Sequence, residues 1–238
     1  MRVAFDLDGV LADLETVLAE AAGRMFGAPE AAPAAPNPES APDAPADGPA
    51  ASAAVADDEP VPPVMRELTT GQQRRLWQGV LDADNFWETL AETEPGIVAR
   101  LATLSRERRW EVIFITQRPT SAGDPCQIQS QRWLARHGFE LPSVYVIRGS
   151  RGKVAAALDL DVVVDDRPDN CLDVVVESKA RAFLVWRGDA SAAAPANAKR
   201  LNIEVVHSVG ECLDALALER DAKTSPGLLG RLKRLIGS

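Results

Sequence analysis

From residue 95 onward the sequence alternates short apolar runs with longer stretches that carry apolar residues at helical spacing. The apolar runs have the length of buried strands, and the stretches between them are long enough for helices that cross between strands. Such alternation predicts a Rossmann-like α/β fold, a mostly parallel sheet with helices on both faces. We expect strands at 112–115, 144–147, 162–164, 183–186 and 203–206, and helices at 97–104, 127–136, 153–158 and 209–218.

A further strand is expected at the start of the chain, where a short apolar run leads into Asp6, Asp8 and Gly9. Side chains two residues apart in a strand share a face, so both carboxylates can point into one site. Such a pair needs a cation or a shared proton, because like charges at short range repel. A second acidic pair, Asp165 and Asp166, directly follows the apolar run at 162–164. Together the two pairs predict one site for a divalent metal.

Other polar residues also follow predicted strands, and the carboxyl ends of strands are where parallel sheets bind ligands. Thr116 ends the strand at 112–115, and Lys153 follows the strand at 144–147. Mg²⁺ prefers a few carboxylates together with substrate oxygens, which this set can provide. A carboxylate can attack phosphorus when a metal and a lysine neutralise the repulsion between the two anions. A second carboxyl can then protonate the leaving oxygen and activate water.

This ordered set of motifs resembles the haloacid dehalogenase superfamily of phosphotransferases. The matching segments are DLDGV at 6–10, Thr116, Lys153 and VVVDD at 162–166. The resemblance implies a core of this fold with a small helical cap inserted after the first strand and helix. It also implies that Asp6 is the nucleophile and a Mg²⁺ ligand.

The same resemblance assigns roles to the other motif residues. Asp8 would be the general acid and base and would bind Mg²⁺ through its main-chain carbonyl. Thr116 would hydrogen-bond the phosphoryl group, and Lys153 would balance the charge of nucleophile and phosphate. Asp166, with Asp165 beside it, would complete the metal shell. An aspartate at position 8 favours phosphatase or mutase chemistry, because the superfamily's dehalogenases lack this carboxylate and its ATPases have Thr there.

Within the superfamily, DLDGVLADLE at 6–15 and VVVDDRPDN at 162–170 are similar to the 5′(3′)-deoxyribonucleotidase family. Phe86 and Trp87 resemble aromatic residues of that family's cap, which stack on the base, although aromatic residues are buried in any core and the cap core is the favoured place for these two. The resemblance implies a nucleoside monophosphate substrate. That family usually has Ser-Pro after the motif threonine, whereas this chain has Gln117 and Arg118. Both are candidate substrate contacts, with a surface ion pair as the alternative for Arg118.

Composition divides the rest of the chain. Residues 28–63 are rich in Ala, Pro, Asp and Glu and have almost no large apolar side chains. Such a segment cannot offset the entropy of ordering by burial, so we expect it to be disordered within a cap region at 27–94. The composition identifies no partner for this segment. The remaining parts are a catalytic core at 1–26 and 95–220 and a basic amphipathic tail at 221–238.

The charge and cysteine content limit the partners and the compartment. A net charge of −9 argues against a nucleic-acid polymer as partner, and seven of the acidic residues lie in 30–59, where no basic residue occurs. The remainder is nearly balanced and is compatible with a small phosphorylated metabolite. Three widely spaced cysteines without a CxxC pair favour a cytoplasmic location. We expect neither a membrane span nor a signal peptide.

Three functions remain open from the sequence. The favoured one is a Mg²⁺-dependent phosphomonoester hydrolase that forms an aspartyl-phosphate and acts on a nucleoside monophosphate. The second is a phosphatase for another small phosphorylated metabolite. The third is a protein without catalysis, either a phospho-acceptor signalling domain or an interaction protein that displays residues 28–63.

Overall fold

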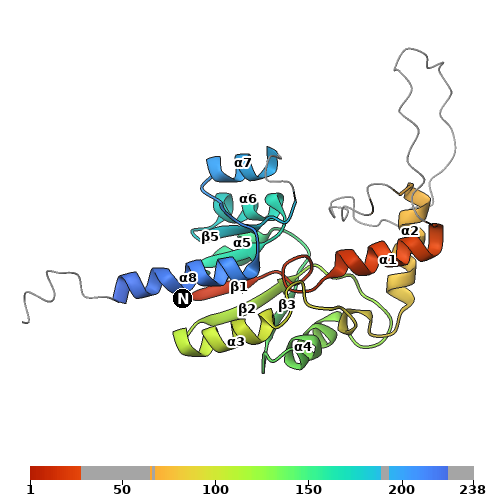
Figure 1. Cartoon of the computed structure of the whole chain (residues 1–238), viewed down its shortest axis with the longest axis horizontal. Helices are drawn as coiled ribbons and strands as arrows, with labels where there is room; N and C mark the ends of the chain where they lie inside the picture. Colours follow the sequence, from red (N-terminus) through yellow and green to blue (C-terminus); the bar gives the residue numbers. More distant parts are fainter. Residues whose placement is uncertain (28–64, 66–67, 189–192, 225–238) are drawn as a thin grey trace, which may run out of the picture. The chain divides into compact units, whose positions relative to one another are not determined.

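The structure is a computed structural model of the whole chain, and it describes residues 1–27, 65, 68–188 and 193–224 (Figure 1). The predicted disordered insertion at 28–63 therefore lies outside the described residues. Most of the predicted basic tail, from 225 to 238, lies outside them as well.

Six parallel strands form one sheet in the order β3-β2-β1-β4-β5-β6. This confirms the predicted Rossmann-like α/β fold. The strands are β1 (Arg2–Phe5), β2 (Glu111–Thr116), β3 (Ser143–Val146), β4 (Val162–Asp165), β5 (Arg181–Val185) and β6 (Glu204–Val206).

The first strand, β1, lies in the middle of the sheet between β2 and β4. Its last residue, Phe5, is in register with Phe114 of β2 and Val164 of β4. The side chains of β1 from Val3 onward are buried, as expected for a strand that is covered on both faces. This register brings the carboxyl ends of three strands to one edge of the sheet, where the acidic motifs begin.

Helices cover both faces of the sheet. The first set is α3 (Ile97–Arg108), α4 (Cys126–Arg136) and α8 (Val209–Thr224), and the second is α5 (Arg151–Ala157), α6 (Pro168–Glu177) and α7 (Ala193–Arg200). Helix α6 contacts α5 and α7, and α3 contacts α8; Figure 1 shows α5, α6 and α7 stacked together. Right-handed crossovers explain the two sets, because the chain moves outward from β1 to β3 and then returns past β1 to β4.

The chain divides into two compact units. Residues 15–78 form the smaller unit, which contains most of α1 (Leu14–Phe26) and of α2 (Thr70–Asp82). Thr69 and Gln72 cap α2 reciprocally, since the Gln72 side chain accepts from the Thr69 N–H at 2.9 Å and the Gln72 N–H donates to the Thr69 hydroxyl at 3.4 Å. The larger unit includes residues 79–94, which the sequence analysis assigned to the cap.

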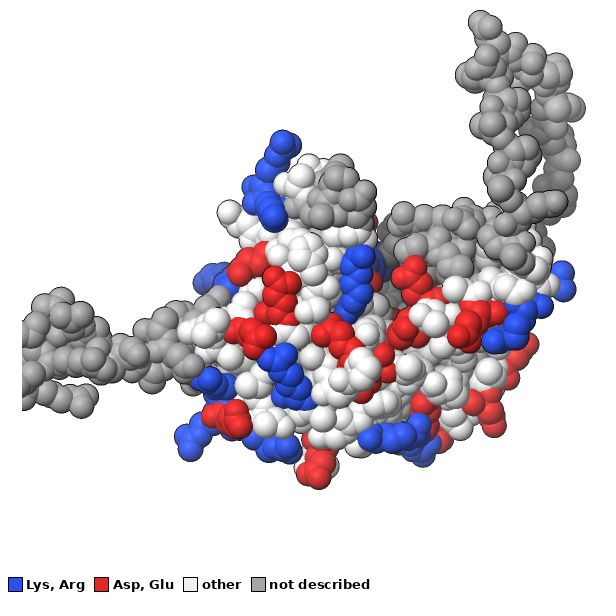
Figure 2. Space-filling view, in the orientation of Figure 1, with Lys and Arg blue, Asp and Glu red and all other residues white. Residues whose placement is uncertain are grey.

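The charged side chains of the described residues are mixed in sign. Figure 2 shows Lys and Arg interspersed with Asp and Glu over the face that it displays. Among the helices that the structure describes, none is long and apolar enough to cross a membrane.

Candidate active site

The loop after β1 brings the acidic motifs together. Asp6 extends the sheet, since its N–H donates to the Val164 carbonyl at 2.9 Å. Gly9 then turns the chain with φ +80°, a conformation that L side chains rarely adopt. A Cβ at Gly9 would also overlap the Asp166 carboxylate. Gly9 is therefore required both for the turn and for the close approach of the two acidic loops.

A buried guanidinium joins two of the carboxylates. Arg151, 3% exposed, forms ion pairs with Asp6 and, from Nε to Oδ2 at 3.3 Å, with Asp165. Asp165 also accepts from the Arg167 N–H at 2.9 Å and from the Asn170 amide at 3.0 Å. Burial raises the pKa of Asp6 well above its usual value, and the neighbouring carboxylates raise it further, although Arg151 opposes this. Arg151 thus supplies positive charge to two buried acids, Asp6 and Asp165.

The sequence prediction named Lys153 as this cation, but the structure places Lys153 on the exposed side of α5. Ser150 caps α5 by accepting from the Gly152 and Lys153 N–H groups at 3.1 and 3.3 Å. Arg151 is therefore the first helical residue. Two residues later the helix has turned by about 200°, so Arg151 and Lys153 face opposite directions. Gly152 has no side chain, so α5 can approach α6 closely. A Cβ at this position would overlap the Asp173 carbonyl.

Three buried polar atoms of this site have no hydrogen-bond partner among the described residues. They are the acceptor Oδ1 of Asp166 and the donors Nη1 of Arg151 and Nε of Arg167. Burial, followed by the charge of Asp165, raises the pKa of Asp166 to about 7. Buried donors and acceptors without a partner are costly unless a ligand satisfies them.

Fewer carboxylates are available to a metal ion in the structure than the sequence predicted. Within the described ranges, no three or more His, Cys, Asp or Glu side chains come together closely enough to hold a metal ion. The carboxylate of Asp8 is turned onto Arg118, and that of Asp165 is occupied by Arg151 and other donors. Asp6, which also pairs with Arg151, and Asp166 are the carboxylates that could hold a metal ion, and the sequence resemblance adds the main-chain carbonyl of Asp8. Two carboxylates completed by water and substrate oxygens are a usual set for Mg²⁺.

Asp8 is held by residues from the end of β2. Thr116 donates from its hydroxyl to Asp8 Oδ2 at 3.3 Å. Arg118 donates from Nε to both carboxylate oxygens, at 3.1 and 2.9 Å, and from Nη2 to Oδ1 at 2.7 Å. The Arg118 side chain has no exposed surface, which corrects the expectation that it contacts substrate or lies in a surface ion pair. The other candidate from this segment, Gln117, is half-buried.

The two aromatic candidates are buried in the larger unit. Phe86 and Trp87 lie in the short 3-10 helix η2 (Phe86–Glu88), with ring centroids 5.1 Å apart in an edge-to-face arrangement. Trp87 is 1% exposed, and its indole N–H donates to the Pro119 carbonyl at 3.2 Å. The structure therefore brings Trp87 next to Arg118, with 4.9 Å between the guanidinium carbon and the ring centroid. It does not present either ring as an exposed stacking face.

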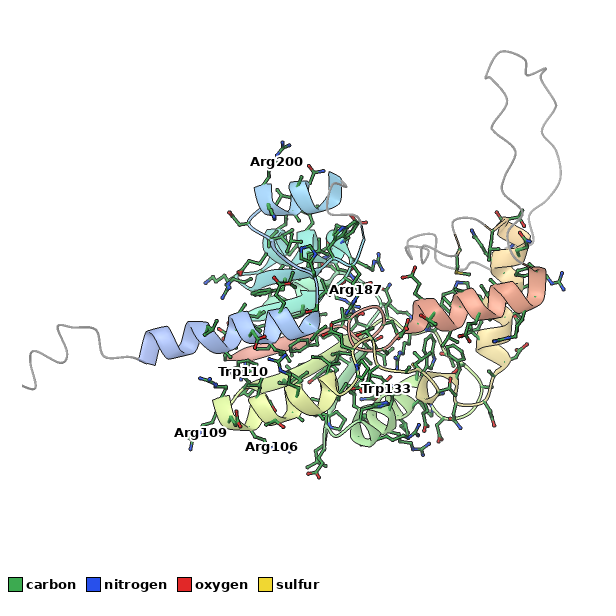
Figure 3. All side chains as sticks on the ribbon, in the orientation of Figure 1. Arg106, Arg109, Trp110, Trp133, Arg187 and Arg200 are labelled. Atoms are coloured by element: carbon green, nitrogen blue, oxygen red, sulfur yellow. The ribbon has the colours of Figure 1, made fainter. Side chains whose placement is uncertain are left out.

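Sequence reasoning missed Arg187, which follows β5. Its guanidinium binds the carbonyl of Gly9 and donates to the Val10 carbonyl and Glu94 at 3.2 Å each. Glu94 in turn accepts from Val209 at 2.6 Å, at the start of α8. Figure 3 labels Arg187 beside the loop that follows β1. The only sequence signal for it was a basic residue directly after a buried strand.

Comparison with known proteins supports the architecture. No family model and no curated protein matches the sequence. Among solved structures, the crystal structure of the "putative beta-phosphoglucomutase" from Thermotoga maritima matches with a TM-score of 0.51 and 19% sequence identity. The match covers 91% of this chain and 98% of that chain. The chain shares the parallel α/β fold of that protein. At this identity the similarity establishes the fold alone.

Proposed function

We propose that this haloacid dehalogenase-like protein is a Mg²⁺-dependent phosphomonoester hydrolase that forms an aspartyl-phosphate on Asp6. The observation that supports this is that two of the unpartnered buried atoms of the site are Nη1 of Arg151, which also forms an ion pair with Asp6, and Oδ1 of Asp166. An oxygen of a phosphate ester would accept from the first, and a cation held by the second would complete the charge balance. Both lie at the edge of the sheet where parallel α/β folds bind ligands.

The residues of the chain would divide the reaction between them. A carboxylate oxygen of Asp6 attacks phosphorus while the bond to the ester oxygen breaks, and Asp8 gives that oxygen a proton. Asp8 then takes a proton from water, which attacks the aspartyl-phosphate and releases inorganic phosphate and free Asp6. Arg151 holds Asp6 in place and donates to the transferred phosphoryl group. Mg²⁺, when bound by Asp6, Asp166 and the Asp8 carbonyl, supplies the charge that lets two anions approach.

The substrate class favoured by the sequence resemblance is a nucleoside monophosphate. The burial of Phe86 and Trp87 removes the stacking argument for this class, so base recognition would rely on other residues. A mutase is the second candidate, because the Thermotoga maritima protein is described as a beta-phosphoglucomutase. In that case the phosphoryl group on Asp6 would pass to a second hydroxyl of the sugar instead of to water.

The decisive measurement is phosphate release from a panel of nucleoside monophosphates, sugar phosphates and p-nitrophenyl phosphate, with Mg²⁺ or with EDTA. We expect turnover with Mg²⁺ alone, and a loss of about 10³-fold or more in Asp6→Asn, which removes the nucleophile. No release from any substrate, or full activity in EDTA, would contradict the proposal. Isomerisation of a sugar phosphate without phosphate release would identify the mutase.

Two further outcomes concern the functions without catalysis. Stable labelling of Asp6 by a small phosphodonor without turnover would indicate a phospho-acceptor domain. If Asp6 is not labelled and no substrate is turned over, the remaining function is that of an interaction protein.

A further inference from the structure

We infer that Arg118 is a positioning residue, which fixes the carboxylate of Asp8 in one orientation for proton transfer. Trp87 and Ser130 hold Arg118 in place. This inference rests on the proposed function, since it assigns Asp8 the acid and base role. It concerns residues that follow the motif threonine and that differ from the Ser-Pro of the family that the sequence resembles.

The contact between Arg118 and Asp8 is a planar fork. Three N–H···O distances between 2.7 and 3.1 Å join the two groups, and both carboxylate oxygens take part. Bidentate pairing of this kind fixes the plane of a carboxylate as well as its position. Thr116 adds a further donor to the same carboxylate at 3.3 Å. Asp8 therefore cannot rotate without breaking several hydrogen bonds at once.

Arg118 is itself held from two other directions. Nη1 donates to the Ser130 hydroxyl at 2.9 Å, and that hydroxyl donates to the Cys126 carbonyl at 2.7 Å within α4. The ring of Trp87 lies under the guanidinium, at a distance typical of a cation–π contact. Trp87 is fixed in turn by its backbone N–H, which donates to Gln129 Oε1 at 3.0 Å. Groups from α4 and η2 thus converge on one arginine.

The burial of Arg118 separates a positioning role from substrate binding. Its side chain has no exposed surface, so it acts on a substrate only through Asp8. General acid catalysis requires the donor to lie within hydrogen-bond reach of the leaving oxygen. A lysine at 118 would keep the positive charge but would lose the planar fork and most of the stacking on Trp87. Arg118→Lys therefore separates the orientation of Asp8 from its charge balance.

The test compares kcat/KM for an alkyl phosphate and for p-nitrophenyl phosphate in the wild type, Arg118→Lys, Asp8→Asn and the double variant. This ratio reports the steps up to phosphorylation of the enzyme, and p-nitrophenolate leaves without a proton. We expect Arg118→Lys to lower kcat/KM on the alkyl phosphate by at least about tenfold more than on p-nitrophenyl phosphate, within the range of general acid catalysis. In the Asp8→Asn background the same change should cost little further, because the two residues act as a unit.

Arg181→Lys is the matched control, since it also alters an arginine–carboxylate pair but at the opposite end of the sheet, with Glu204. Arg181→Lys should leave kcat/KM unchanged on both substrates. If Arg118→Lys does not fold, Ser130→Ala removes the acceptor of Nη1 and should show the same substrate difference at smaller size. An active wild type with equal losses on both substrates, or additive losses in the double variant, overturns this inference alone. A wild type inactive on both substrates overturns the proposed function, and the inference with it.

Discussion

Gly9 meets two requirements that any side chain would violate. Its φ of +80° costs a residue with Cβ about 1–3 kcal/mol, and the added atom would overlap the Asp166 carboxylate. We therefore expect Gly9→Ala to lower the free energy of unfolding by at least this amount and to lower phosphatase activity. Urea unfolding and phosphate release measure the two effects.

The control for this change is Gly23→Ala, because Gly23 lies in α1 with nothing near the position of its Cβ. There the added methyl should stabilise the helix by about 0.5–1 kcal/mol. Equal effects at both positions would mean that the approach of Asp166 to Gly9 is not required.

Arg151 and Lys153 give a direct test of which cation serves the site. Arg151→Met should lower activity strongly, because it leaves Asp6 and Asp165 without their buried counter-charge. Lys153→Met changes an exposed side chain and should alter stability by no more than about 0.5 kcal/mol. Steady-state assays of both variants, with thermal unfolding as the check on folding, decide between them. Loss of activity in Lys153→Met alone would return the role to Lys153.

At this scale the sequence predicts which segments meet, but not which side chain in a helix faces the site. The placement of Asp6 and Asp166 at one edge of the sheet follows from the alternation of strands with helices. In such a sheet the carboxyl ends of parallel strands meet at the same edge. The choice of Arg151 over Lys153 depends on the cap at Ser150 and on how closely α5 approaches α6. Both are properties of packing between distant segments, which residue spacing does not contain.

At the scale of elements, the contact between α5 and α6 positions Arg151. A Cβ at Gly152 would overlap the Asp173 carbonyl, a backbone atom that can move only with its helix. We expect Gly152→Ala to cost about 1–3 kcal/mol of stability through overpacking and to lower activity by shifting Arg151. Chemical unfolding and phosphate release are the measurements. Gly79→Ala in α2, where the added methyl meets nothing, should not destabilise.

The expected strands agree with the structure within two residues at each end, because buried parallel strands are short continuous apolar runs. Helix α6 (Pro168–Glu177) was not predicted, and it contains three consecutive valines at 174–176, residues that favour strands. Pro168 at its first position is a helix-start signal in the sequence. The contacts of this segment with α5 and with the sheet stabilise the helix, so tertiary packing overrides local propensity here.

For the whole molecule, the raised pKa values of Asp6 and Asp166 predict how stability depends on pH. Asp166 in the folded state binds a proton with a pKa of about 7, whereas in the unfolded chain it releases the proton near its ordinary value of 3.8. Between these values the folded state holds more protons, so the free energy of unfolding of the metal-free protein should fall as pH rises.

Urea unfolding of the EDTA-treated protein at several pH values between 4 and 8 measures this slope. Asp166→Asn cannot titrate and should show a shallower slope, and Mg²⁺ should reduce the slope of the wild type by binding the ionised form. Identical slopes in the wild type and in Asp166→Asn would contradict the assignment of the raised pKa.

The central place of β1 also governs the order in which the chain can fold during its synthesis. β1, which leads into Asp6, leaves the ribosome before its neighbours β2 and β4, which begin only at Glu111 and Val162. At ribosomal rates of about 5–20 residues per second, β4 follows β1 by about 10–30 s. Throughout that interval one or both edges of the apolar strand β1 are unpaired, and unpaired strand edges promote aggregation. Newly made chains should therefore depend on chaperones until residue 165 has emerged, long after Asp6.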